Sequence, residues 1–514
     1  MSILSVTTEP LGGSPLAKLA IGGAGSAEWL VPRPMSPAAW RARADGARAA
    51  VDPGWADALA PALGAGATLV ADVAARGGVV VTTGQQPGLL GGPLYTLHKA
   101  LTARALAAAV TAETGVPAVA VFWAATDDAD IAEARSTTLA LAGGARRFSG
   151  PALGVEGEVM GQRTLGDVEE AVAAAIAAAG AEADATLSRA LRAAYSQSKT
   201  VGGAYVELMR ALLEPLGVPV LDAWHPALRR AASPHLRRAL RGAAAVSAAV
   251  HARDAALTAA GHAPQVSEVA GLSLVFALRD GVKERIPIAD ASARASDARD
   301  DGLSANVLLR PVLEAQLMPT VAYVAGPGEL AYFAQATAVA EALGVRAPLG
   351  VPRWSGTVIE PHVARMLERR ALTPTELADS HAAETSRAFE QLDARARDAF
   401  DRLRAAADAE AAVLSAALPP GVPARSVEGM RQQLYHRIER MARRFTAAAK
   451  RGDTEMMRDL ATVRGALCPN GGRQERSIAW FPYVARHGEA LLGLLEDAMA
   501  THASALVRGS VLPG

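Results

Sequence analysis

The chain has 514 residues, half of them apolar and 4% aromatic, and its 52 basic residues balance 52 acidic residues. The length allows about three domains. The balanced charge excludes an electrostatic footprint for nucleic acid, and the lack of any apolar run of about 18 residues excludes a predicted membrane span. The N-terminus lacks the cationic flank and apolar core of a signal peptide, and the single cysteine, Cys468, excludes an internal disulfide. We therefore expect a cytoplasmic, helix-rich α/β protein without a nucleic-acid or membrane partner.

Short apolar runs in the first 360 residues predict the buried strands of a parallel α/β sheet. The first two runs are separated by an Ala/Leu-rich helix of crossover length, which is typical of a βαβ unit. The strands are expected at Val79–Thr83, Val116–Trp123, Thr320–Ala325 and near Leu349–Pro352, the last of the chain. A helix is expected from Leu330 onward. Three of the strands end in polar turns that contain Gly or Pro. Because the carboxyl ends of parallel strands share one edge, we expect a ligand to bind there.

An insertion of about residues 157–300 interrupts this pattern. It is largely helical as far as residue 262. The pair Asp280-Gly281 then predicts the tight turn of a β-hairpin, with strands at Leu272–Leu278 and Lys283–Ile288. We therefore assign residues 1–360 to one core that carries helical and hairpin insertions.

Long charged helices follow residue 360. Apolar residues recur at steps of three and four in two helices joined by a Pro/Gly turn at residues 418–423, which is typical of an antiparallel coiled coil. The predicted seam comprises Phe389, Leu392, Ala396, Ala399, Leu403, Ala406, Val427, Met430, Leu434, Ile438, Met441, Phe445 and Ala448. Alanine buries little area, so we expect a further helix or a second subunit to cover the seam, and a homodimer is predicted. We place this domain at residues 361–470 and expect the aromatic run 480–483 to dock residues 471–514 on the core.

The most informative motif is the glycine-rich turn Thr83–Lys99, which lies between a strand and a helix. Glycines let the backbone approach a ligand, and the free N–H groups of a helix N-terminus favour an anion. Gln85 and Gln86 add neutral donors and Lys99 adds a cation, so ligand contact is favoured over a plain turn. The spacing is neither a Walker A loop nor GxGxxG. For His98, a proton-transfer role and a satisfied hydrogen-bonding role remain equally open.

Polar residues also follow the other strands. Asp127, Asp128 and Asp130 come directly after the second strand and repel one another unless a cation lies among them. Metal ligation and a solvated turn with a helix-capping aspartate both remain open; the solvated turn is favoured, and no metal site is predicted. Arg310 and Arg353 offer guanidinium groups for a carboxylate or phosphate. Other candidates near the strand ends are Asn306, Gly328, Glu329 and Ser355.

Together these motifs resemble the bacillithiol biosynthesis cysteine-adding enzyme family, BshC. The resemblance lies in Thr83–Lys99, Val121–Trp123 with its acidic cluster, Asn306–Pro311, Pro319–Tyr332, Val351–Arg353, Gln474–Arg476 and Phe481–Tyr483. It implies a Rossmann-like parallel-sheet core with connecting-peptide insertions, an α-helical antiparallel coiled-coil domain and a homodimer. The implied activity is a ligase that forms the amide bond between cysteine and the amine of glucosaminyl-malate, the last step of bacillithiol biosynthesis. ATP is the expected activating nucleotide, by adenylation or phosphorylation.

The resemblance also assigns roles to residues. The catalytic set is His98, Lys99 and Asp128. The substrate- or anion-binding set is Gln85, Gln86, Gly88, Thr96, Asp127, Asp130, Asn306, Arg310, Gly328, Glu329, Arg353 and Ser355. The chain departs from the family pattern at Ala129, where the family has a histidine, and this removes the obvious general base. Two alternatives therefore stay open: an ATP-dependent ligase with a different amino acid or amine, and a non-catalytic dimeric ligand-binding protein.

Overall fold

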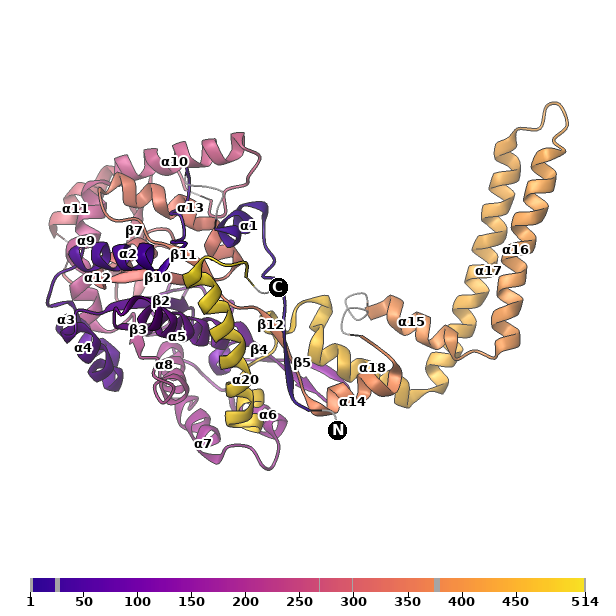
Figure 1. The fold of residues 1–514 in the computed structure, drawn as a ribbon, viewed down its shortest axis with the longest axis horizontal. Helices are drawn as coiled ribbons and strands as arrows, with labels where there is room; N and C mark the ends of the chain where they lie inside the picture. The colour runs from indigo at the N-terminus through magenta and orange to yellow at the C-terminus, as the bar shows by residue number, and fades with distance from the viewer. Residues whose placement is uncertain (1–2, 24–27, 268, 298, 374–379, 513–514) are drawn as a thin grey trace. The chain divides into compact units, whose positions relative to one another are not determined.

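The computed structural model describes residues 3–23, 28–267, 269–297, 299–373 and 380–512. The chain forms two compact units, each described by itself. The sheet unit comprises Leu4–Leu139, Arg147–Ile359 and Glu475–Gly514, and the helical unit comprises Met1–Ile3, Ala140–Arg146 and Glu360–Gln474. The elements of both units are labelled in Figure 1.

A five-stranded parallel sheet with the order β11-β10-β2-β3-β6 forms the centre of the sheet unit. Its strands are β2 (Val79–Gln85), β3 (Ala118–Ala124), β6 (Val220–Asp222), β10 (Thr320–Ala325) and β11 (Gly350–Pro352). The apolar strand residues are almost all buried, as expected for a parallel sheet covered on both faces. This confirms the predicted parallel α/β core. The strand β6 is absent from the predicted elements, because a three-residue strand shows no period of its own.

Helices surround this sheet. They are α1 (Pro15–Gly22), α2 (Pro37–Ala49), α3 (Trp55–Leu63), α4 (Ala67–Ala75), α5 (Leu94–Thr114), α6 (Glu169–Ala179), α7 (Ala185–Ala194), α8 (Val201–Leu213), α9 (Pro226–Arg241), α10 (Ala243–Ala259), α11 (Ala291–Asp297), α12 (Arg310–Leu317), α13 (Pro327–Ala342), α19 (Gln474–Ser477) and α20 (Phe481–Arg508). The crossover from β2 to β3 runs through α5, which confirms the predicted βαβ unit. The helix expected from Leu330 begins earlier, because Pro327 fits its first turn.

Smaller sheets complete the strand inventory. They are β1 (Ser5–Thr8) with β12 (Gly356–Ile359), β4 (Ser136–Leu141) with β5 (Gly144–Ser149), and β8 (Val282–Pro287) with β7 (Leu272–Arg279) and β9 (Leu303–Ala305). The predicted hairpin is confirmed by β7 and β8, which Asp280 (φ 49°) and Gly281 (φ 79°) connect. Two successive positive φ angles are what a two-residue hairpin turn requires. The strand predicted to be the last is β11, and β12 follows it and pairs antiparallel with β1.

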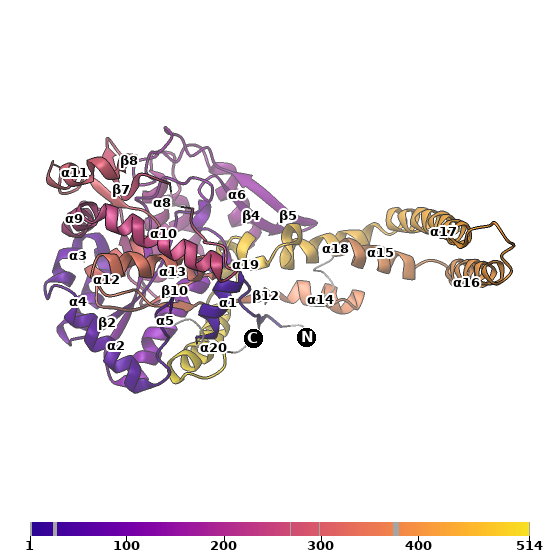
Figure 2. The same cartoon turned by 90° about the horizontal axis from the view of Figure 1, so that it is seen from above.

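The C-terminal helix α20 packs along α5 in the sheet unit, and the two helices lie side by side in Figures 1 and 2. By length and composition alone, Phe481–Arg508 and Trp55–Ala75 could each cross a membrane. However, Leu59 and Val70 are buried in the core of the sheet unit, and Leu495 of α20 is also buried. Core helices of water-soluble proteins have the same composition, so these stretches do not indicate a membrane protein.

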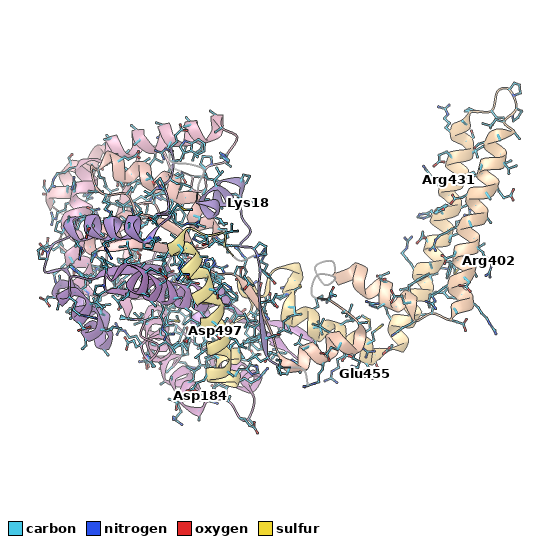
Figure 3. All side chains as sticks on the ribbon, viewed as in Figure 1. Lys18, Asp184, Arg402, Arg431, Glu455 and Asp497 are labelled. Atoms are coloured by element: carbon cyan, nitrogen blue, oxygen red, sulfur yellow. The ribbon has the colours of Figure 1, made fainter. Side chains whose placement is uncertain are left out.

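The helical unit consists of α14 (Pro361–Arg370), α15 (Ser380–Glu390), α16 (Ala394–Ala416), α17 (Ala424–Gly452) and α18 (Thr454–Leu467). The helices α16 and α17 pack against each other along a two-helix seam, which fits the predicted coiled coil. Arg431 of α17, labelled in Figure 3, forms an ion pair with Asp408 of α16 at 3.0 Å. Arg404 and Glu439 form a second interhelical pair at 2.8 Å.

The predicted seam is wrong in its register. Buried seam positions are Phe400, Ala407, Ala411, Val427, Ala442 and Thr446. The predicted first helix breaks after Glu390, because Asp393 caps a new helix by accepting a hydrogen bond from the Arg395 N–H. Val427 is buried as predicted, whereas the large apolar residues of the predicted seam that remain exposed are Leu403, Met430, Leu434, Met441 and Phe445. They form an apolar surface beside the seam, which we call the exposed apolar stripe.

Candidate functional site

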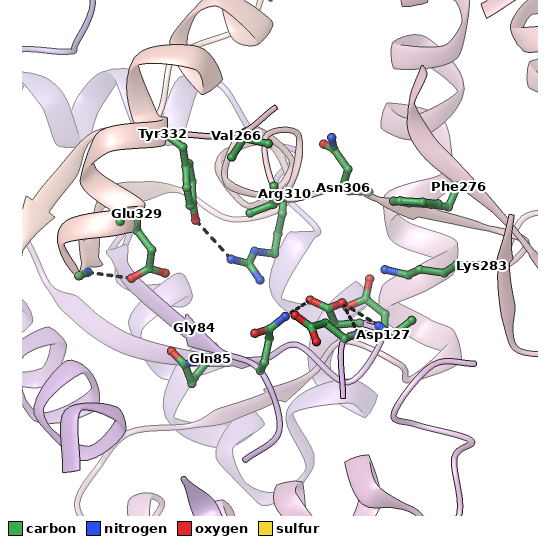
Figure 4. Close-up of a pocket in the computed structure, with 18 of the residues that line it drawn as sticks. Gly84, Gln85, Asp127, Val266, Phe276, Lys283, Asn306, Arg310, Glu329 and Tyr332 are labelled. Carbon is green, nitrogen blue, oxygen red and sulfur yellow. Dashed lines mark hydrogen bonds between the residues drawn. The ribbon is translucent and has the colours of Figure 1, made fainter. Parts of the chain in front are cut away.

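A cavity of about 920 Å³ lies at the carboxyl edge of the parallel sheet, within the usual range for small-molecule sites. Four strand ends line it, with Gly84–Gln86 at the end of β2, 127–130 after β3, 326–329 after β10 and Arg353 after β11. The expectation that the polar turns share one edge is therefore confirmed. Figure 4 shows Asp127 and Lys283 on one side of the cavity, and Glu329 and Tyr332 on the other.

The β7–β8 hairpin forms a further wall with Phe276, Lys283 and Arg285. Lys283 and Arg285 are two residues apart in β8 and so share one face of the strand. Their cationic groups lie 5.1 Å and 5.4 Å from the Phe276 ring centroid. This cationic wall is absent from the predicted site, although the period-two spacing of the two cations is visible in the sequence.

The buried Lys99 forms an ion pair with the partly buried Glu329 in the cavity wall, with the Lys99 Nζ 2.7 Å from Glu329 Oε2. Glu329 also accepts hydrogen bonds from the Tyr323 hydroxyl and the Gly326 N–H, both at 2.7 Å. Burial raises the pKa of Glu329, but Lys99 and these donors outweigh it and leave the pKa below its usual value. Lys99 donates further to the carbonyl of Gly84. The lysine charge is therefore balanced within the protein, and the pair ties α5 to α13.

The acidic cluster after β3 is held by neighbouring donors. Gln86 Nε2 donates to Asp128 Oδ2 at 2.7 Å, and the N–H groups of Ala129 and Asp130 donate to Asp128 Oδ1. Burial raises the pKa of Asp128, yet Lys283 and these hydrogen bonds lower it overall, so the carboxylate is ionised. Among the residues that the structure describes, no group of three or more His, Cys, Asp or Glu side chains is arranged to hold a metal ion.

Asp127 differs from Asp128 in having a free acceptor. Ser304 donates its hydroxyl to Asp127 Oδ2 at 2.7 Å. Asp127 Oδ1 accepts no hydrogen bond from any described part of the chain, and Asp127 lines the cavity. This oxygen is available to a positively charged or hydrogen-bonding ligand.

Besides Arg285 of the hairpin, Arg310, Arg353 and Arg476 line the cavity. The Arg310 Nη2 lies 3.4 Å from the Tyr332 hydroxyl, a contact drawn in Figure 4. Arg353 is buried and held bidentately by Glu475, with both N–O distances 2.7 Å. A guanidinium group matches the geometry of a carboxylate, so this side of the cavity suits an acidic ligand.

The cavity thus brings together most of the predicted site residues. These are Gln85, Gln86, Lys99, Asp127, Asp128, Asp130, Asn306, Arg310, Gly328, Glu329 and Arg353. Asn306 uses its side-chain oxygen to accept from the N–H groups of Leu308 and Leu309, so it also caps the turn before α12.

His98, Gly88, Thr96 and Ser355 do not line this cavity, so their contact with a ligand stays a prediction that the cavity does not support. His98 is fully buried against Trp354, with its Nδ1 3.2 Å from Glu475. Thr96 is fully buried in α5, the Gly88 carbonyl accepts the Tyr195 hydroxyl, and Ser355 donates to Glu475. The helix turn of α5 rotates His98 away from the face that presents Lys99.

The C-terminal part of the glycine-rich turn is covered by the protein's own chain. The Leu94 N–H, at the start of α5, donates to the Ile478 carbonyl at 2.8 Å. The Trp480 indole N–H donates to the Gly91 carbonyl at 3.0 Å, and a Cβ at Gly91 would lie 2.6 Å from the indole ring. Gly91 therefore makes room for the C-terminal residues, and anion binding by the remainder of the turn stays a prediction.

Two family models match this chain. The model described as "Bacillithiol biosynthesis BshC, N-terminal Rossmann-like domain" matches residues 67–354, and "Bacillithiol biosynthesis BshC, C-terminal coiled-coil domain" matches residues 356–505. A Koribacter versatilis protein named "Putative cysteine ligase BshC" is 33% identical over 451 residues, which cover 83% of each chain. Proteins of the same name from Solibacter usitatus and Salinibacter ruber are 30% and 29% identical. Those alignments cover 83% of this chain and 83% and 82% of the respective relatives. The matches confirm the predicted family and both kinds of domain.

Proposed function

This chain belongs to the BshC family of bacillithiol biosynthesis, and we propose that it is a ligase that joins cysteine to the amine of glucosaminyl-malate. The observation that carries the proposal is the presence of both carboxylates and arginines in one cavity. Asp127, Asp128 and Asp130 follow β3, and Arg310, Arg353 and Arg476 line the same cavity. Glucosaminyl-malate has an amine on its sugar and two carboxylates on its malate group, so the cavity offers groups of opposite charge to both parts of the molecule.

In the proposed complex, the two malate carboxylates face Arg310, Arg353 and Arg476. The sugar amine faces Asp127, whose Oδ1 is free to accept a hydrogen bond from it. Asp128 already accepts three hydrogen bonds and holds the acidic turn in shape. Asp127 is therefore better placed than Asp128 to orient the amine and to receive its proton.

The bond formed is an amide between the cysteine carboxyl carbon and the sugar nitrogen. Because a carboxylate is a poor electrophile, we propose that ATP first converts it to an acyl phosphate with release of ADP, or to an acyl adenylate with release of pyrophosphate. Attack by the amine then releases phosphate or AMP, and the amine loses one proton. The cations Lys283 and Arg285 form no ion pair within the described residues and suit the phosphates, with the Phe276 ring beside them.

The direct test is incubation of the purified protein with cysteine, glucosaminyl-malate and ATP, followed by mass spectrometry of thiol products. We expect a product of cysteine plus glucosaminyl-malate minus water, formed only when ATP is present. The proposal fails if no such product forms, or if a Lys99→Ala variant behaves identically to the wild type. Thermal-shift screening of other amino acids and amino sugars tests the alternative of a ligase with a different substrate.

We also propose that the protein is a homodimer, with a second copy covering the exposed apolar stripe of Leu403, Met430, Leu434, Met441 and Phe445. Large apolar side chains gathered along one helical pair are typical of an interface between subunits. Sedimentation of the purified protein tests this, and a monomer at micromolar concentration contradicts it. Dimerisation without turnover or nucleotide binding would instead favour the non-catalytic alternative.

A further inference from the structure

Residues 475–483, here called the docking segment, pack onto the glycine-rich turn of the sheet unit. The Ala479 N–H donates to the Thr138 carbonyl at 2.9 Å, and Ile478 accepts the Leu94 N–H. Trp480 is fully buried and fills the space over Gly91, which has a φ of 85°. A side chain at Gly91 would collide with the indole ring, so this turn requires glycine for docking. The segment is therefore held at a fixed position beside the cavity.

The first residue of the docking segment, Glu475, is a buried carboxylate with a dense set of donors. Arg353 donates through Nη1 and Nη2 at 2.7 Å each, Ser355 through its hydroxyl at 3.0 Å, and His98 through Nδ1 at 3.2 Å. A carboxylate only accepts, so the His98 Nδ1 carries the proton. Burial raises the pKa of Glu475, but His98 and Arg353 lower it well below its usual value. Glu475 is ionised and has little freedom to move.

Arg353 is fixed by this carboxylate yet retains donors for a ligand. A guanidinium group has five N–H bonds. Three are used, two by Glu475 and one by the Trp354 carbonyl at 2.8 Å. The other two have no acceptor in the described parts of the chain, although Arg353 is 3% exposed and lines the cavity. Because Arg353 lines the cavity, a bound carboxylate could accept hydrogen bonds from these N–H groups.

The second residue of the docking segment, Arg476, lines the same cavity and is exposed. It forms no ion pair or hydrogen bond with any described residue. The two adjacent residues Glu475 and Arg476 therefore face in different directions. Glu475 faces inward and holds Arg353, while Arg476 faces the cavity and adds an uncompensated positive charge.

We propose that the docking segment completes the carboxylate-binding side of the cavity. Glu475 is a positioning residue that fixes Arg353, and Arg476 is a ligand-binding residue. The glycine-rich turn fixes the position of the docking segment, and the docking segment in turn positions Arg353 and Arg476 for the ligand. The identity of the ligand as a malate group rests on the proposed function.

The experiment is calorimetric titration of malate alone into the full-length protein, which needs no turnover. We expect Glu475→Gln and Arg476→Gln each to weaken malate binding about tenfold, a typical loss for one charge-assisted contact. If Glu475 acts through Arg353, adding Glu475→Gln to an Arg353→Gln variant changes the affinity by less than about twofold. In the turnover assay, Glu475→Gln raises the KM for glucosaminyl-malate and leaves kcat nearly unchanged.

Glu496→Gln is the matched control, because it removes a carboxylate paired with Arg104 in the same unit but outside the cavity. A purely structural role for Glu475 would lower the Tm and leave the malate affinity unchanged, and that result overturns the proposal. If Glu475→Gln does not fold, Arg476→Gln and the milder Ser355→Ala replace it in the test. We then expect the malate affinity to fall about tenfold in Arg476→Gln and about threefold in Ser355→Ala. Unchanged affinity in both variants, or no malate binding by the wild type, also overturns it.

The outcomes separate this inference from the proposed function. Product formation with unaltered malate affinity in the variants refutes the role of the docking segment alone. Malate binding that depends on Arg476, without any amide product, refutes the ligase and leaves the carboxylate site standing.

Discussion

Glu314 provides a test of how burial and the neighbouring Arg310 set the pKa of a carboxyl group next to the cavity. It lies in α12, is 1% exposed, and has its Oε1 3.8 Å from the Arg310 Nε. Burial raises the pKa of the Glu314 carboxyl from 4.5 to about 7, and the attraction of Arg310 offsets only part of this effect. Replacing Glu314 with glutamine keeps the shape of the side chain and removes its titration.

The direction of the effect follows from proton linkage. Between pH 4.5 and about 7 the folded protein holds a proton on Glu314 that the unfolded chain has lost. The wild type therefore loses stability as the pH rises through this window, and the loss is complete above pH 7. The shift corresponds to roughly 3 kcal/mol. For a folding unit of roughly 400 residues this amounts to a change of about 4 °C in Tm.

The assay is calorimetric unfolding of the wild type and Glu314→Gln from pH 5 to pH 9. Part of the effect already lies below pH 5, so the Tm of the variant minus that of the wild type should become more positive by about 3 °C across this range. Glu496→Gln serves as the control, since its side chain is partly exposed. A difference that stays constant within about 1 °C would mean that Arg310 keeps Glu314 ionised throughout, and the argument from burial would be refuted.

Three further substitutions test other parts of the structure. Lys99→Met leaves Glu329 buried without its cation and should lower the free energy of unfolding by about 3–5 kcal/mol, measured by denaturant titration; adding Glu329→Gln should recover part of the loss. Asp127→Asn should lower kcat/KM on the order of 10²-fold with an unchanged Tm, measured by initial rates, if Asp127 receives the amine proton. Leu434→Glu should convert the proposed dimer to a monomer in sedimentation while the helical circular-dichroism signal is retained.

The elements with strong local signals were predictable from the sequence. The apolar runs at β2, β3 and β10 identify buried strands because their length and flanking turns are local properties. The Asp280-Gly281 pair identifies its hairpin for the same reason. The coiled-coil register was not predictable from apolar steps alone, because the Asp393 cap restarts the helix and shifts which residues face the seam.

The candidate site was predictable only where it follows from sheet geometry. Asp127 and Glu329 come together because both follow strands of one parallel sheet. Lys283 and Arg476 belong to a hairpin and to a C-terminal segment, and their approach to the cavity depends on tertiary packing. The packing of Trp480 over Gly91 was not predictable, because a glycine that admits a ligand and one that admits an indole ring leave the same sequence signature.

The alanine at position 129 bears on how the proposed reaction can proceed. Ala129 lines the cavity, and none of the described residues that line it is a histidine. His98, the histidine of the glycine-rich motif, is buried, and burial lowers its pKa so that it stays neutral while it supports Glu475. The proton that leaves the amine must therefore pass to a carboxylate or directly to water. Asp127 has the free oxygen for this step, whereas the oxygens of Asp128 are already engaged. In the proposed reaction, the alanine at this position therefore places the demand for proton transfer on Asp127, and the Asp127→Asn variant tests that role.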